Sequence, residues 1–341
     1  MKKYDVIVVG CGPAGIAAAK VLEKSNLSFC IIEKSKFPRF KLCGGGLTNK
    51  SQKILKKLYI KLDTLDSFDC QKVKIVAKDI SKEIELENKI IMVDRSEFDY
   101  NNFKQINPEH LFTEENITSI SENTLTTNKD SYEFKYIIFA DGVNGYSKKL
   151  IKSHDFAFCI ECDVDEKTTE TIFDFEAVKD GYCWIFPKKK KTTIGLMSSN
   201  KKTPDYLKLL CDFAKKNNFT IDKTNIKGYH IPIFSKETYK KSVIDDKYIL
   251  VGDAASLVDP VTGEGIYYAL VSGMYAAQSI MEVKDDKKLS EIYFEKTKNL
   301  YNSLNKRTKA SKLLYSNLGN KFIKMGLNSD TIIDKLKRLF G

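Results

Sequence analysis

Arginine and histidine are scarce in this chain of 341 residues, and long apolar runs are missing. Only four of the 56 basic residues are arginine, which disfavours nucleic-acid binding, because such surfaces usually combine arginine with clustered stacking aromatics. The three histidines lie in ordinary contexts, so we assign them no catalytic role, and we expect no metal site. No stretch of about 18 uninterrupted apolar residues is present, which excludes a transmembrane helix.

We also expect no secretion signal. Residues 1–5 lead directly into the strand-like residues 6–9, without an apolar segment followed by a small-residue cleavage site. We therefore expect a cytoplasmic protein. Its composition excludes global disorder, since 42% of the residues are hydrophobic and 20 phenylalanines and 17 tyrosines are available for a core.

The eight cysteines are scattered through apolar, strand-like stretches, unlike the disulfide framework of a small secreted protein. Cys159 and Cys162 have the C-x-x-C spacing of a metal or redox site. However, residues 156–164 alternate like a strand, and positions i and i+3 of a strand point to opposite faces. We interpret both cysteines as structural.

The net charge of +11 is concentrated near the C-terminus. Residues 284–341 contain 14 Lys/Arg against 6 Asp/Glu, and residues 299–329 contain no acid. Apolar residues recur there at helical spacing, at Leu300, Leu304, Leu314, Leu318 and Phe322. The favoured interpretation is a solvated lysine face on a packed helix. The alternative is a basic amphipathic helix, within 299–341, that contacts a membrane surface.

The N-terminal region has the pattern of a dinucleotide-binding βαβ unit. We predict a buried strand over residues 4–9, a helix over 16–24 and a second strand over 28–32. Between the first strand and the helix lies Gly10-Cys-Gly-Pro-Ala-Gly15, and Glu33 follows the second strand. A G-x-G-x-x-G turn in this setting, with an acid about 20 residues further on, is typical of a dinucleotide site.

Each glycine has a physical role in such a turn. Gly10 makes the tight turn, Gly12 lets the backbone approach a pyrophosphate, and Gly15 lets the helix pack close to the strand. The helix N-terminus supplies free N–H groups for phosphates. We expect Ala14, in this turn, to bind the cofactor as well. Glu33 would accept hydrogen bonds from a ribose diol. The motif alone does not distinguish NAD from FAD.

Two later strands also end in acid-bearing turns. Residues 136–140 are closed by Asp141-Gly142, and residues 248–251 by Gly252-Asp253. An acid at the C-terminal tip of a parallel strand lies where open α/β sheets bind ligands, so Asp253 is placed to hold a ribityl or ribose hydroxyl. A long apolar helix follows, ending near Met281. The residues expected to bring its N-terminus to a negative flavin locus are Pro260, Gly263, Gly265 and Ile266.

In order and spacing, these three segments resemble the p-hydroxybenzoate-hydroxylase-like FAD flavoproteins over nearly the whole chain. The resemblance implies that FAD is the cofactor and that Arg95 contacts it. Arg39 and Arg95 are half of the arginines in a chain that otherwise uses lysine. This choice is consistent with a requirement for bidentate hydrogen bonds or for stacking of a guanidinium group at these positions.

Two further segments are similar to the geranylgeranyl reductase family. They are residues 37–46, Phe-Pro-Arg-Phe-Lys-Leu-Cys-Gly-Gly-Gly, and residues 180–188, Asp-Gly-Tyr-Cys-Trp-Ile-Phe-Pro-Lys. The resemblance implies that an Arg-x-Lys-x-Cys-Gly element, with Cys43 and Gly44, lies beside the flavin. It also implies that a Tyr-x-Trp-x-Phe-Pro element lines the substrate cavity.

The second segment also indicates a cavity wall without the resemblance. In a strand, Tyr182, Trp184 and Phe186 share one face, and Pro187 ends the strand. An apolar wall of three aromatics would suit a long hydrocarbon substrate. The alternative is that these three aromatics simply pack in the core of a sheet, which would show the same pattern.

By resemblance, the protein uses reduced FAD to hydrogenate isolated C=C bonds of prenyl chains. Hydride goes to one alkene carbon and a proton to the other. Cys43 is the candidate for positioning or proton delivery, and no histidine or acid stands out as the general acid. No second dinucleotide motif is present. Two kinds of electron donor therefore remain possible, namely a protein such as ferredoxin, or NAD(P)H.

The expected fold is α/β, with a Rossmann-like FAD-binding domain interleaved with an antiparallel-sheet substrate domain and a helical C-terminus. We expect residues 1–59, 94–155 and 241–283 to bind FAD, 60–93 and 156–240 to form the substrate cap, and 284–341 to be helical. One rival function is a flavin-dependent aromatic monooxygenase or halogenase, although halogenases carry Trp-x-Trp-x-Ile-Pro where this chain has Tyr-Cys-Trp-Ile-Phe-Pro. Another is a non-catalytic flavin electron-relay protein at a membrane.

Overall fold

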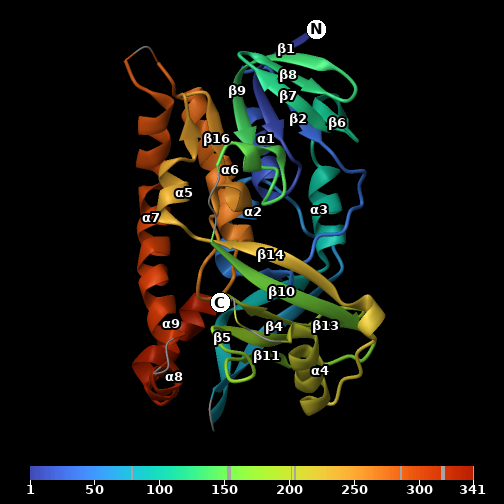
Figure 1. Cartoon of the computed structure of the whole chain (residues 1–341), viewed down its shortest axis with the longest axis vertical. Coiled ribbons are helices and arrows are strands. Elements are labelled where there is room, and N and C mark those ends of the chain that lie inside the picture. The colour runs from blue at the N-terminus through green and yellow to red at the C-terminus, as the bar shows by residue number, and fades with distance from the viewer. Residues whose placement is uncertain are drawn as a thin grey trace.

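Two eight-stranded sheets, one above the other in Figure 1, make up the framework of the molecule. The computed structural model describes residues 1–77, 80–151, 155–200, 202, 205–284, 286–315 and 319–340. In the last two helices it includes the side chains of 319, 323–334 and 337. The expected fold class is confirmed, because a largely parallel sheet is interleaved in sequence with a largely antiparallel one and the C-terminus is helical.

The first sheet has the order β15-β16-β9-β1-β2-β6, with β7 and β8 extending it from β9. Its strands are β1 (Lys2–Val9), β2 (Phe29–Glu33), β6 (Leu111–Thr113), β7 (Ile117–Ser121), β8 (Thr124–Thr127), β9 (Ser131–Phe139), β15 (Val243–Ile244) and β16 (Tyr248–Leu250). The central strands pair in parallel. Their carboxyl ends therefore meet at one edge, where the glycine-rich turn and both acid-bearing turns also lie.

Helices cover this sheet because its strands are apolar on both faces. Along β1, Val6 and Val8 face the layer that contains α1 (Pro13–Leu22) and α6 (Ile266–Met281), while Ile7 and Val9 face the opposite core. The two helices approach closely, since a Cβ on Gly273 of α6 would lie 2.0 Å from the Ala14 carbonyl oxygen. This packing places the N-terminus of α1 against the middle of α6.

The second sheet has the order β14-β10-β13-β12-β11-β4-β5-β3. Its strands are β3 (Gly46–Leu47), β4 (Ser67–Ala77), β5 (Ile80–Val93), β10 (Asp155–Val164), β11 (Thr171–Asp174), β12 (Gly181–Pro187), β13 (Thr192–Ser198) and β14 (Lys227–Ile233). All neighbours are antiparallel except β4 and β11, which are parallel. The short strand β3 joins this sheet by pairing with β5, which is distant in sequence.

The remaining helices are α2 (Asn49–Lys57), α3 (Arg95–Phe103), α4 (Tyr206–Lys216), α5 (Lys236–Lys240), α7 (Leu289–Leu314), α8 (Gly319–Leu327) and α9 (Asp330–Phe340). Figure 1 shows α7 running along one side of the molecule to α8 and α9 near β5. Leu300 and Leu304 of α7 are buried against the first sheet, and Leu327 and Ile333 belong to the core of the second. The C-terminal helices are thus packed parts of the fold. Within the described ranges, no helix is both long and apolar enough to span a membrane.

The cysteine interpretation is confirmed. Cys159 lies in the core on one side of β10 and Cys162 in the core on the other, as expected for positions i and i+3 of a strand. All eight cysteines are free thiols. No cluster of three or more His, Cys, Asp or Glu side chains suited to a metal occurs among the residues that the structure describes.

Candidate active site

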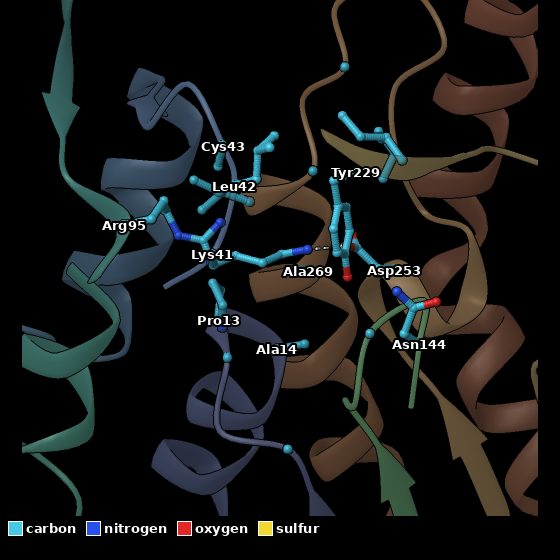
Figure 2. A pocket seen from close by; sticks show the side chains of 18 of the residues that line it. Pro13, Ala14, Lys41, Leu42, Cys43, Arg95, Asn144, Tyr229, Asp253 and Ala269 are labelled. Atoms are coloured by element: carbon cyan, nitrogen blue, oxygen red, sulfur yellow. Dashed lines mark ion pairs between the residues drawn. The ribbon is translucent and has the colours of Figure 1, made fainter. Parts of the chain in front are cut away.

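A cavity of about 700 Å³ lies between the two sheets. Its walls come from the glycine-rich turn, the segment 39–46, the aromatic face of β12 and the loop that precedes α6. Figure 2 shows Pro13 and Ala14 at one side, with Arg95, Cys43 and Lys41 above them. Of the residues predicted to form the site, Gly15, Pro187 and Pro260 lie outside the lining, and the following line it: Gly10, Gly12, Ala14, Glu33, Arg39, Cys43, Gly44, Arg95, Asp141, Gly142, Tyr182, Trp184, Phe186, Asp253, Gly263, Gly265 and Ile266.

The glycine-rich turn has the geometry that its spacing predicts. Gly10 has φ +95°, and a Cβ there would lie 2.5 Å from the Ala140 carbonyl oxygen. A Cβ on Gly15 would lie 1.9 Å from the Gly10 carbonyl oxygen, so Gly15 serves helix packing and not the lining. Gly12 caps α1 without any side-chain hydrogen bond, and its Cβ direction is open to the cavity. The turn therefore presents an uncapped helix N-terminus to the cavity.

Glu33 ends β2 and is already engaged with the backbone. Its Oε2 accepts the Cys11 N–H at 2.8 Å and its Oε1 accepts the Ser35 N–H at 2.8 Å. The side chain is buried and lines the cavity. A carboxylate can accept about four hydrogen bonds, so Glu33 keeps capacity for a ribose hydroxyl.

Two arginines share one buried carboxylate, which the sequence did not reveal. Arg95 donates to Asp99 from Nε and Nη2, at 3.1 and 3.0 Å, and Arg39 Nη2 lies 3.4 Å from the same carboxylate. Asp99 is 1% exposed. The two guanidinium charges are balanced by Asp99 and by Glu33, which lies 3.9 Å from Arg39 Nε. The guanidinium N–H groups beside the glycine-rich turn are donors that suit a phosphate-bearing ligand.

The two acid-bearing turns have different local roles. Asp141 accepts both the Ser147 hydroxyl, at 2.6 Å, and the Ser147 N–H, at 2.9 Å, so its carboxylate holds its own turn. Gly142 has φ +71° and no atom within 4 Å of its Cβ position, which leaves open space at that point. Asp253 instead lies 3.6 Å from Lys41, whose ammonium is 3.9 Å from the centre of the Tyr229 ring. Figure 2 shows Lys41 reaching across the cavity towards Asp253.

The loop before α6 is held from outside by the C-terminal helix. Arg307 of α7 forms an ion pair with the fully buried carboxylate of Asp259, and the Tyr315 hydroxyl donates to the Val261 carbonyl at 2.7 Å. The Tyr182 hydroxyl donates to the Thr262 carbonyl from the cavity side. Pro260 is buried within this loop but does not reach the cavity. The basic C-terminal segment therefore helps to shape the site.

The aromatic face of β12 forms one wall of the cavity, as its alternation predicts. Tyr182, Trp184 and Phe186 all line it, while Cys183 and Ile185 face the core beneath α4. Glycines make room for the rings. A Cβ on Gly44 would lie 2.6 Å from Phe186, and one on Gly195 would lie 2.2 Å from Trp184. Pro187, at the end of the strand, is buried outside the lining.

The structure adds an acid that the sequence did not single out, because Glu161 lines this cavity. Its Oε1 accepts the Cys43 N–H at 3.0 Å, and the side chain is 7% exposed. Burial raises the pKa of Glu161 to about 7. The signal available in the sequence was a charged residue at an inward position of the alternating strand, two residues after Cys159.

Three further residues of the site were not predicted from the sequence, although the sequence contains an indication of each. Lys41 is part of the Arg-x-Lys-x-Cys-Gly element, and Arg307 is one of only four arginines in the chain. Asp99 follows Arg95 by four residues, the spacing of a helical ion pair.

Comparison with other proteins agrees with this geometry. A family model described as pyridine nucleotide-disulphide oxidoreductase matches residues 4–171. An uncharacterized protein of Methanosarcina barkeri is 34% identical over 306 residues, which cover 82% of this chain and 75% of the relative. A digeranylgeranylglycerophospholipid reductase of Methanosphaerula palustris is 28% identical over 315 residues, covering 82% of this chain and 77% of the relative.

Solved structures share the fold over nearly the whole chain. A geranylgeranyl bacteriochlorophyll reductase-like protein from Thermoplasma acidophilum has a TM-score of 0.81 and 23% identity, covering 98% of this chain and 96% of that one. The flavin-dependent brominase Bmp2 has a TM-score of 0.80 and 17% identity, covering 99% and 93%. At these identities the structural likeness shows the fold, and the choice between chemistries depends on the site.

Proposed function

The chain belongs to the geranylgeranyl reductase family of FAD-dependent oxidoreductases, and we propose that it reduces carbon–carbon double bonds of a geranylgeranyl-type prenyl chain. The observation that carries this proposal is a single cavity that joins the dinucleotide turn to the aromatic face of β12. Reduced FAD supplies the hydride, and the residues of the chain bind and orient the two reactants.

The residues around the turn fit the diphosphate of FAD. At Gly12 the nearest atom to a Cβ would be Arg39 Nη2 at 3.5 Å, so backbone and guanidinium face the same space. Arg39 Nε is buried and has no hydrogen-bond partner among the described residues. A diphosphate placed there would accept hydrogen bonds from the N-terminus of α1 and from Arg39.

The wall formed by Tyr182, Trp184 and Phe186 suits a hydrocarbon chain. Phe173 and Met197 extend this apolar surface, so a prenyl chain would be bound mainly by burial. Each buried CH₂ group contributes about 0.8 kcal/mol, which makes specific polar contacts along the chain unnecessary. Such a wall also excludes water from the reacting double bond.

Flavin reoxidation with and without oxygen tests the proposal. The FAD-loaded protein is reduced under nitrogen and mixed with geranylgeranyl lipids, while the flavin absorbance is followed. We expect oxidised flavin to return under nitrogen only when a prenyl compound is present. Reoxidation that requires oxygen, and consumes it in step with an aromatic substrate, would instead support a monooxygenase or halogenase. Bound FAD that no prenyl lipid or diphosphate reoxidises would support an electron-relay protein.

Reduction of the FAD-loaded protein by candidate donors identifies the electron donor. NADPH, NADH and reduced ferredoxin are each offered to the oxidised holoprotein under nitrogen, and the donor is the one that bleaches the flavin at a rate equal to or above that of turnover.

We also propose that residues 299–341 contact an anionic membrane surface, where a prenyl lipid resides. Lys309, Lys312 and Lys324 are exposed on α7 and α8, and the side chains of Met325 and Ile332 are 67% and 40% exposed. Lysines attract anionic headgroups, and exposed apolar side chains can enter the interface. The inward contacts of Arg307 are compatible with this arrangement, because they use a different face of α7.

Charge reversal tests this contact better than deletion, because deletion would remove Arg307 from the site. The double variant Lys309→Glu, Lys312→Glu should bind anionic vesicles about 30-fold more weakly, from about 1 kcal/mol per lysine. The matched control, Lys208→Glu with Lys215→Glu on exposed positions of α4, should bind like wild type. Co-sedimentation measures both. Equal losses in the two variants, or no binding by wild type, would contradict the contact.

A further inference from the structure

Glu161 lies on the same sheet face as the aromatic wall. Across neighbouring strands, Phe173 pairs with Trp184, Trp184 with Gly195, and Gly195 with Glu161. Residues in register across a sheet project to the same side. The row therefore places a carboxyl group beside the three aromatics that line the cavity.

Gly195 lets the carboxyl group and the indole lie next to each other. A Cβ at this position would lie 2.2 Å from Trp184 Cζ2 and 2.9 Å from Glu161 Cβ. Any larger residue would separate the two side chains or displace one of them. The glycine therefore creates a place where the acid borders the space for a hydrocarbon.

One oxygen of the Glu161 carboxyl group accepts a hydrogen bond, and the other has no partner among the described residues. Oε1 accepts the N–H of Cys43, which fixes the carboxyl group against the segment beside the flavin site. Oε2 is buried and has no hydrogen-bond partner among the described residues. Burying a polar atom without a partner costs free energy, so this oxygen is held for an interaction that the protein alone does not provide.

The surroundings favour the protonated form of this carboxyl group. Burial is the largest influence and raises its pKa to about 7. Lys188 and Lys191, from the turn between β12 and β13, act in the opposite direction, as does the Cys43 N–H, while Asp163 on the same strand raises the pKa. Cys159, Lys41 and the Cys43 thiol are other titratable groups nearby.

We propose that Glu161 is the acid that protonates the alkene, a role that rests on the proposed reductase function. The π bond of the substrate is consumed by two new C–H bonds. Bound FAD, when reduced, would supply the hydride and its two electrons to one carbon. Glu161 would give the proton of its carboxyl O–H to the other carbon, and the resulting carboxylate would recover a proton from water. The Glu161 carboxyl group lies beside the aromatic wall and keeps one oxygen without a partner among the described residues, so its position suits proton donation to the double bond.

Three variants separate this role from its rivals. Glu161→Gln keeps the acceptor for the Cys43 N–H but removes the acidic proton. Cys43→Ala removes the thiol and keeps the backbone N–H that orients Glu161. Glu85→Gln changes an exposed carboxylate on β5, another strand of the same sheet, that does not line the cavity, and it serves as the control. FAD content measured for each variant checks that the cofactor site is intact.

Single-turnover reoxidation of the reduced holoprotein by a prenyl lipid is the first readout. We expect Glu161→Gln to be at least about 100-fold slower, the usual cost of losing a general acid, and Glu85→Gln to stay within about twofold of wild type. Wild-type rates should fall as pH rises through about 7, because the protonated form is the active one. A Glu161→Gln rate equal to wild type, or the 100-fold loss appearing in Cys43→Ala instead, would overturn the proposal.

Infrared spectroscopy of the oxidised holoprotein is the second readout and needs no turnover. A protonated carboxyl C=O band should disappear as pH rises through about 7 in wild type and should be missing in Glu161→Gln. Titration of this band in the ordinary glutamate range would overturn the proposal. If the band titrates as expected but no prenyl compound reoxidises the wild-type flavin, the reductase function fails and takes this role with it. If wild type turns over and Glu161→Gln does so equally, the role of Glu161 alone fails.

Discussion

A Gly12→Ala variant should fold but lose its flavin. The nearest atom to the added methyl group would be Arg39 Nη2 at 3.5 Å, an ordinary contact, and the backbone at Gly12 is not left-handed. Replacing glycine at a helix N-cap by alanine costs about 0.5–1 kcal/mol of stability. The methyl group would, however, stand between the N-terminus of α1 and a diphosphate. We expect FAD affinity to fall at least about 100-fold, or about 2.8 kcal/mol.

Gly15→Ala provides the matched comparison, since it alters the same turn for a different reason. Its Cβ would lie 1.9 Å from the Gly10 carbonyl oxygen, so α1 has to move away from the sheet. We expect a loss of about 3 kcal/mol in the free energy of unfolding, measured in urea. Flavin content and unfolding free energy together distinguish the two glycines. A Gly12→Ala protein that retains FAD at wild-type affinity would contradict the placement of the diphosphate.

An Arg307→Met variant should lose about 3–5 kcal/mol of stability, because it leaves the buried Asp259 carboxylate without its cation. The loop between Asp259 and Gly265 would loosen at the same time, and FAD content should fall. The double variant Arg307→Met, Asp259→Asn should recover most of the stability. Asparagine oxygen still accepts the Val261 N–H that Asp259 accepts at 2.8 Å, and no charge remains buried.

The pH dependence of this loss has a defined sign. Burial raises the pKa of Asp259, and Arg307 lowers it, so removing Arg307 raises it further. A carboxyl group whose folded-state pKa exceeds its unfolded value destabilises the fold as pH rises between the two values. The deficit of Arg307→Met should therefore be smaller near pH 4 than near pH 7, and the double variant should lack this difference. An Arg307→Met protein as stable as wild type near pH 7 would show that Arg307 does not hold the loop.

The parts of the site that the sequence predicted are those fixed by local geometry. In the turn from Gly10 to Gly15, a left-handed backbone at Gly10 and close approaches at Gly10 and Gly15 permit only glycine at those two positions. The face shared by Tyr182, Trp184 and Phe186 follows from the period of a strand. The late turn at Asp253 follows from the strand before it and the helix after it.

The parts that the sequence did not predict depend on pairing between distant segments. Glu161 reaches the aromatic wall only because β10, β13 and β12 are neighbours in one register. Asp99 contacts both Arg39 and Arg95. These arginines lie far apart in the sequence, so no local pattern predicts that they share a carboxylate. The count of charges in the C-terminal segment was correct, but a count cannot show that Arg307 points inward while Lys309 points outward.

The mass of the product from one anaerobic turnover tests the central claim most directly. Fully reduced FAD-loaded protein is mixed with an equimolar geranylgeranyl lipid under nitrogen, and the lipid is extracted and analysed by mass spectrometry. The proposed function predicts a product heavier by two hydrogen atoms, formed in proportion to the flavin oxidised. An unchanged lipid beside fully reduced flavin, for every prenyl compound offered, would contradict it.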